Sequence, residues 1–153
     1  MQRFFLPLNC FADGRIHFPS ATSRQILQVL RMDPIRGQVA VIDPEGREFL
    51  VQLDGVVDGS LQGQILGPLE GSAEASLRLT LCFSLTKREK MELILQKCTE
   101  IGVTAFQPYV SSRSLVQAEI LEPKRLARWQ EIIREACEQS HRRRLPEVLP
   151  LLR

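Results

Sequence analysis

The sequence of 153 residues is poor in aromatic side chains, which make up 6% of it, and it contains only two histidines. It has no apolar run near the ~20 residues that span a bilayer, and its first residues lack the long apolar core of a signal peptide. Glycine and proline number nine each, too few for a collagen-like or low-complexity chain. We therefore expect a globular, cytoplasmic protein with no membrane association.

The four cysteines form no CxxC pair and stand far apart, at Cys10, Cys82, Cys98 and Cys137. Zinc sites normally use closely spaced pairs of ligands, so we expect no metal. In a cytoplasmic protein these residues are expected to be reduced thiols, most of them buried. The sequence also contains no GxGxxG, Walker A, GxSxG or HExxH motif, which removes the common nucleotide-binding and hydrolase signatures.

Charge is unevenly distributed along the chain. Residues 1–75 contain 6 Lys and Arg against 9 Asp and Glu, whereas residues 76–153 contain 14 against 9. The basic second half is suited to binding a polyanion through phosphate contacts and release of counterions. A charged surface that only faces solvent has the same composition, so charge alone leaves both interpretations open. The change of charge, with the breaker-rich stretch at residues 68–76, predicts two domains, 1–72 and 73–153.

The first half consists of short β-favouring runs separated by turn residues. Pro44 and Gly46 favour a hairpin between two of these runs, because proline presets φ and glycine accepts a positive φ. Ile26, Val29 and Leu30 recur at helical spacing and predict a short helix that closes one end of a small, curved β-barrel. The predicted strands are residues 3–6, 15–18, 38–43, 48–53 and 60–66.

The second half alternates strand and helix patterns. Residues 77–85 alternate apolar and polar side chains, which predicts a strand, and residues 103–110 predict a second one. The helix between them should make the two strands parallel by a right-handed crossover. A further helix begins at Pro123, and residues 148–152 are apolar enough for a last strand. The predicted buried faces of the helices are Met91, Ile94, Leu95, Cys98 and Ile101, then Leu126, Trp129, Ile133, Ala136 and Cys137.

Basic side chains group after the first strand of this half and after its last helix, at residues 142–144. Side chains that follow the carboxyl ends of parallel strands gather at one edge of a sheet, where ligands usually bind. Lys87 and Arg113 should therefore lie near each other at that edge. The alternative explanation for these basic groups is that they are cations that only face solvent. For Glu92, the alternative is a solvent-facing helix surface with local ion pairs. No acid–base partner of His141 can be identified, so the sequence assigns no catalytic residue.

An ordered set of short motifs resembles the ribosomal RNA small-subunit methyltransferase E family. The first residues contribute two matches, Arg3-Phe4-Phe5 and Val29-Leu30-Arg31. The others are Lys90-Met91-Glu92, Gln96-Lys97, Glu100-Ile101-Gly102-Val103, Pro108, Ser112-Arg113-Ser114, Arg128-Trp129, and Glu138-Gln139-Ser140 with Arg142 to Pro146. The resemblance covers the whole chain.

The resemblance implies an α+β protein: an N-terminal PUA-like β-barrel that binds RNA, then the first β/α part of a SPOUT-type domain. It also implies a homodimeric enzyme that uses S-adenosylmethionine to methylate N3 of one uridine in 16S ribosomal RNA, with the rRNA or the small ribosomal subunit as partner. Lys87 and Lys90 are also substrate-binding candidates, because they follow the carboxyl end of the first predicted strand of this half. The RNA contacts implied by the family are Arg3, Arg31, Arg113 and Arg142, with Gln139 as a further candidate.

Members of this family continue beyond the position of Arg153 with a glycine-rich loop and a knot that hold the methyl donor. We therefore expect this chain to supply RNA-binding elements but no cofactor pocket, with the catalytic residues beyond Arg153. Alone, it should neither bind S-adenosylmethionine nor methylate RNA. The alternatives are a stand-alone RNA-binding module without catalysis, and a scaffold whose basic surface only faces solvent.

Overall fold

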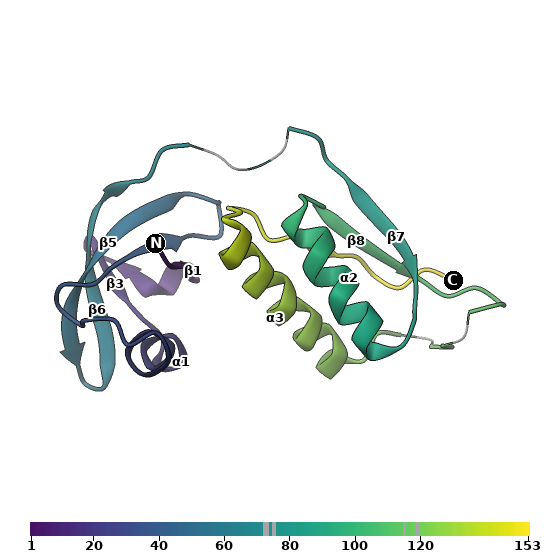
Figure 1. Cartoon of the computed structure of the whole chain (residues 1–153), viewed down its shortest axis with the longest axis horizontal. Coiled ribbons are helices and arrows are strands. Elements are labelled where there is room, and N and C mark those ends of the chain that lie inside the picture. The colour runs from purple at the N-terminus through teal and green to yellow at the C-terminus, as the bar shows by residue number, and fades with distance from the viewer. Residues whose placement is uncertain (72–73, 75, 115, 119) are drawn as a thin grey trace. The chain divides into compact units, whose positions relative to one another are not determined.

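The computed structural model describes residues 1–71, 74, 76–114, 116–118 and 120–153. It divides into two compact units, Met1–Gly71 and Ser72–Arg153, and each is described by itself (Figure 1). Among these described residues, no helix is both long and apolar enough to cross a bilayer. The same described residues include no group of three or more His, Cys, Asp or Glu side chains that could hold a metal ion.

The first unit is built on one six-stranded sheet with the order β1-β4-β5-β6-β3-β2. Strand β1 pairs parallel with β4, through Arg3 opposite Ala40, and every other pairing is antiparallel. Its elements are β1 (Arg3–Phe5), η1 (Leu8–Cys10), β2 (Phe11–Ala12), β3 (Arg15–His17), α1 (Ser20–Arg24), η2 (Gln25–Val29), β4 (Gln38–Ile42), β5 (Glu48–Val57) and β6 (Ser60–Pro68).

The structure confirms the mixed α+β class but corrects the predicted barrel. Within the described part of the unit, β1 and β2 remain the two edges of the sheet, so the pairing does not close on itself. The predicted helix is present as α1 followed by the π-helical turn η2. Ile26 is fully buried, as expected. Val29 is 72% exposed, because the helical segment ends at this residue, although the apolar spacing in the sequence continues to Leu30.

Two tight turns fix the register of the central strands. The predicted hairpin between β4 and β5 is present, and the Asp43 carboxylate accepts bonds from the Glu45 and Arg47 amides. Strands β5 and β6 are joined by Asp58 and Gly59 alone, between the paired residues Val57 and Ser60. Both turn residues have positive φ, 50° and 77°, as the two-residue turn that matches strand twist requires.

The second unit contains a three-stranded parallel sheet with the order β7-β8-β9. Its elements are β7 (Thr80–Ser84), α2 (Arg88–Glu100), β8 (Ala105–Tyr109), α3 (Pro123–Ser140) and β9 (Glu147–Val148). Helices α2 and α3 pack against each other and lie on the same face of the sheet (Figure 1). The predicted parallel crossover is therefore confirmed.

The helix–sheet core follows the predicted apolar stripes in most positions. Phe83 of β7 meets Phe106 of β8 and Trp129 of α3 in edge-to-face contacts, with ring centroids 6.2 and 6.0 Å apart. Trp129 is 4% exposed, which confirms its predicted place in the core. Two expectations are wrong. Leu77 is 68% exposed because β7 begins only at Thr80, and Ile101 is 78% exposed because α2 has ended.

The four thiols differ in burial, and their reactivity should follow it. Cys10 and Cys137 are buried, Cys98 is half-buried and Cys82 is exposed. Burial raises the pKa of the Cys137 thiol to about 12, which leaves almost no thiolate at neutral pH. Titration of the native chain with a chromogenic disulfide reagent should show Cys82 reacting first and Cys137 only on unfolding. A Cys82→Ser variant should lose the fast phase, and a fast phase that persists in it would contradict this assignment.

Candidate nucleic-acid interface

The carboxyl edge of the parallel sheet is formed by the ends of β7 and β8 and by the helices that start beside them. Helix α2 begins at Arg88, directly after the extended residue Lys87. Helix α3 begins with Pro123 at its first position, where a missing N–H costs nothing. The unpaired backbone amides at helix N-termini carry partial positive charge and attract anions. Two such ends close to one sheet edge make this the favourable place for a polyanion.

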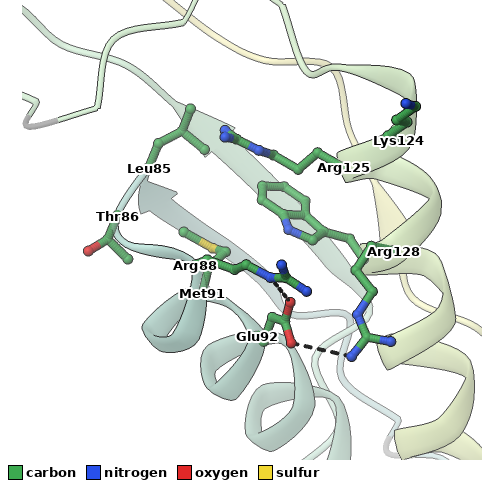
Figure 2. Close-up of a pocket in the computed structure, with 9 residues that line it drawn as sticks. Leu85, Thr86, Arg88, Met91, Glu92, Lys124, Arg125 and Arg128 are labelled. Carbon is green, nitrogen blue, oxygen red and sulfur yellow. Dashed lines mark hydrogen bonds and ion pairs between the residues drawn. The ribbon is translucent and has the colours of Figure 1, made fainter.

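A cavity of about 370 Å³ lies at this edge between the first turns of α2 and α3. Its apolar lining consists of Leu85, Met91 and Trp129, each less than 5% exposed. The remaining lining is Thr86 and charged side chains: Arg88, Glu92, Lys124, Arg125 and Arg128. Figure 2 shows the Arg125 side chain extending from α3 toward Leu85. The cavity therefore combines an apolar floor with four cations and a single carboxylate.

The carboxylate in this cavity joins the two helices. Glu92 Oε1 accepts a bond from Arg88 Nε at 2.8 Å, and its Oε2 lies 3.4 Å from Arg128 Nη2. Arg128 also bonds Glu131 at 2.9 Å. The Arg88 and Arg128 guanidinium groups hold the pKa of the Glu92 carboxyl below its usual value. Glu92 therefore stays ionised and fixes both arginines at the wall of the cavity (Figure 2). The ion pairs predicted for Glu92 are thus present.

The other two cations of the cavity have different surroundings. Lys124 and Arg125 are exposed, and neither forms an ion pair or a side-chain hydrogen bond with any described residue. Three cations within the first six residues of α3 oppose the helix dipole, which favours anions at an N-terminus. A functional anion would remove this cost. Lys124 and Arg125 are not among the residues predicted from the sequence, although two cations in the first turn of a predicted helix indicate an anion site.

Three of the predicted RNA contacts belong to the carboxyl edge. Lys87 and Lys90 flank the start of α2 and are exposed. Arg113 is exposed on the loop after β8, and that loop is tied to β7 by a 2.9 Å bond between the hydroxyls of Ser84 and Ser114. The three side chains therefore face solvent at one edge of the sheet. Their contacts with RNA remain a prediction.

Arg142 and Gln139 belong to the opposite edge of the sheet, Gln139 in the last turn of α3 and Arg142 just after the helix. Gln139 is exposed there, but Arg142 is only 3% exposed. Its guanidinium donates to the carbonyls of Thr99 and Val103 and pairs with Glu74 at 2.9 Å. This geometry does not fit the predicted RNA contact of Arg142, because its donors point into the protein. Arg142 instead holds the end of α2 to the start of the unit.

The first unit contains the two remaining candidates. Arg3 Nε donates to Glu48 Oε1 at 2.7 Å, and its side chain is 17% exposed, so its first role is to neutralise a buried carboxylate. Arg31 is exposed and has a positive φ of 51°. The RNA contacts of Arg3 and Arg31 also remain predictions.

Comparison with known proteins gives a consistent result. Residues 73–153, more than half of the chain, match the family model described as RNA methyltransferase domain. A ribosomal RNA small subunit methyltransferase E of Synechocystis is 44% identical over 72 residues, which is 47% of this chain and 23% of that protein. The protein of the same name from Bacillus subtilis is 29% identical over 153 residues, covering 97% of this chain and 59% of its own length.

Solved structures agree with the sequence relatives. The structure of a ribosomal RNA small subunit methyltransferase E from Neisseria gonorrhoeae bound to S-adenosyl methionine superposes with a TM-score of 0.86 at 37% identity. The match covers 99% of this chain and 62% of that one. This chain thus spans about three fifths of the length of each of these two proteins from Bacillus subtilis and Neisseria gonorrhoeae. The resemblance found in the sequence motifs is confirmed, and the chain belongs to the RNA methyltransferase domain family.

Proposed function

We propose that this chain is the RNA-recognition part of an enzyme that methylates N3 of a uridine in 16S ribosomal RNA with S-adenosylmethionine. In this proposal the first unit is a PUA-like RNA-binding domain and the second is the first part of a SPOUT domain, in a cytoplasmic homodimer. The family membership and the names of the relatives support the reaction class. The observation that carries the RNA-binding role is the cation-lined carboxyl edge of the second unit.

The residues of this chain do not fit the methyl donor. S-adenosylmethionine carries a positive sulfonium, whereas the cavity at the carboxyl edge is lined by four cations and one carboxylate that is already paired with Arg88 and Arg128. The second unit contains a single glycine, Gly102, in the turn after α2, so its own residues offer no glycine cradle for a cofactor. The donor site in this proposal therefore lies outside the residues of this chain.

What these side chains can do is bind and orient the RNA. Arginine and lysine neutralise phosphates, and a fixed guanidinium gives a backbone a defined register. Cations near a bound uridine also favour its deprotonated imide, since an opposite charge favours the ionised form of an acid. Positioning and electrostatic stabilisation of this kind supply a large part of many catalytic effects.

The proposal predicts salt-dependent RNA binding without donor binding. A fragment of 16S rRNA that includes the substrate uridine should bind the chain, and about five phosphate contacts would give a slope near −3.5 for log K against log salt on single-stranded RNA. Fluorescence anisotropy between 50 and 300 mM salt measures this slope, and calorimetry with S-adenosylmethionine should show no heat of binding.

Each part of the proposal can fail separately. No RNA binding at 50 mM salt would overturn the RNA-binding role and favour a scaffold with a solvated surface. Saturable binding of S-adenosylmethionine would overturn the placement of the donor site.

A further inference from the structure

The carboxyl-edge cavity has two chemically different parts. Its floor is formed by Leu85, Met91 and Trp129, which are buried in the unit and still border the cavity. Its mouth is formed by the cations of α2 and α3. A phosphate ion alone would need only the mouth, and an apolar ligand only the floor. A ligand that satisfies both has an apolar face with an anionic group attached.

We propose that this cavity binds one unpaired RNA nucleotide, with the base against the apolar floor and its phosphate at Arg125 and Lys124. The choice of RNA over a free nucleotide rests on the proposed function. Volumes of about 300–1,000 Å³ are typical of small-molecule sites, and the cavity of about 370 Å³ lies at the lower end, suited to a single nucleotide. Single-stranded RNA is generally recognised by splayed bases placed against aromatic or apolar side chains.

The pairing of the cations decides which of them meet the phosphate. Arg88 and Arg128 are already held by Glu92, and Arg128 also by Glu131. Arg125 extends over the cavity toward Leu85 (Figure 2) and forms no ion pair with any described side chain. Arg125 and Lys124 are therefore the groups whose charge is available, and the Arg125 guanidinium can bind a phosphate with two parallel bonds. The Arg88–Glu92–Arg128 network keeps the cavity wall in place around the base.

The chain supplies its own reporter for this site. Trp129 is its only tryptophan and lines the cavity, so a base that enters should change tryptophan fluorescence saturably. The probe is a five-nucleotide uridine-containing RNA, compared with the same oligonucleotide carrying abasic sites in place of the bases. We expect saturable quenching with the RNA, and at least tenfold weaker binding with no quenching for the abasic form.

Variants locate the phosphate contact. Arg125→Ala should weaken oligonucleotide binding about tenfold and lower the magnitude of the salt slope by about 0.7, as loss of one phosphate contact requires. Lys97→Ala is the matched control, because Lys97 is an exposed cation of α2 that does not line the cavity. It should change the affinity less than twofold. An unchanged denaturation midpoint of each variant shows that the unit still folds.

The outcomes separate this inference from the proposed function. RNA binding by the unchanged chain that is indifferent to Arg125→Ala, or equal quenching by the abasic oligonucleotide, overturns the nucleotide site and leaves the RNA-binding role intact. Absence of all RNA binding overturns both. Uridine monophosphate that binds as tightly as the oligonucleotide overturns the assignment to RNA in favour of a free nucleotide.

Discussion

Replacing Arg142 by methionine should lower the free energy of unfolding of the second unit by about 3–5 kcal/mol, the usual cost of removing one partner of a buried ion pair. Methionine keeps most of the side-chain volume, so the loss reports the polar contacts. These are the carbonyls of Thr99 and Val103 and the carboxylate of Glu74, which also accepts the backbone amides of Arg143 and Arg144.

Urea unfolding followed by the fluorescence of Trp129 measures this effect, since the only tryptophan of the chain belongs to the second unit. Arg144→Met is the matched control: the Arg144 side chain is exposed, and its bond to Glu74 uses only the backbone amide. It should change the free energy of unfolding by less than about 0.5 kcal/mol. Equal effects of the two substitutions would show that the buried guanidinium contributes nothing specific.

The same ion pair makes the stability of the second unit sensitive to acid. Burial alone would raise the pKa of Glu74, but the bonds from Arg142, Arg143 and Arg144 outweigh it and hold that pKa below its ordinary value of 4.5. A depressed folded-state pKa contributes stability that is present above the unfolded-state value and lost as the pH falls toward the folded-state value. Stability should therefore fall below about pH 4.5, and less steeply in Arg142→Met.

Gly63→Ala should destabilise the first unit by about 1–3 kcal/mol, the range for overpacking a well-packed site. A Cβ at this position of β6 would lie 2.5 Å from Val51 Cγ1 and 2.9 Å from the carbonyl oxygen of Gln52 on β5. The second contact is with backbone, so a strand has to move. Gly67→Ala is the matched control on the same strand, because a Cβ there meets nothing within 4 Å.

Amide hydrogen exchange of β5 and β6 measures this effect, since the first unit contains neither tryptophan nor tyrosine. Protected amides should exchange about 5–150-fold faster in Gly63→Ala. Gly67→Ala should change the exchange rates of these amides no more than an ordinary surface substitution does. Similar exchange in the two variants would mean that β5 and β6 have room between them that the structure does not show.

The sequence predicts the elements of this protein well where the pattern repeats within one element. The stripe of Met91 and Leu95, and that of Trp129 and Ile133, are buried as expected. Errors occur where an apolar residue falls just past the end of an element, as Ile101 does after α2. Periodicity describes side-chain direction only while the backbone keeps its helical geometry, so it carries no information beyond the last turn.

Predictions of individual site residues depend on partners that are distant in the sequence. Arg142 is the first of three consecutive arginines, a run that is typical of a solvated or RNA-binding patch. It is nevertheless buried and paired with Glu74, 68 positions earlier in the sequence. The cavity likewise combines Leu85, the first turn of α2 and the first turn of α3, and no local pattern indicates that these segments meet. The edge itself was predictable, since parallel strand topology determines where chain segments leave the sheet.

The parallel pairing of β1 with β4 has a kinetic consequence. The hairpin of β5 and β6, closed by Asp58 and Gly59, needs only neighbouring residues, and hairpins form in about 1–10 μs. Strand β1 must wait for β4, because Arg3 pairs with Ala40. During synthesis at ~5–20 residues per second, this interval lasts about 2–7 s. Phe4, which is buried in the finished sheet, is unprotected throughout that time, so the segment around β1 is one that a chaperone would meet.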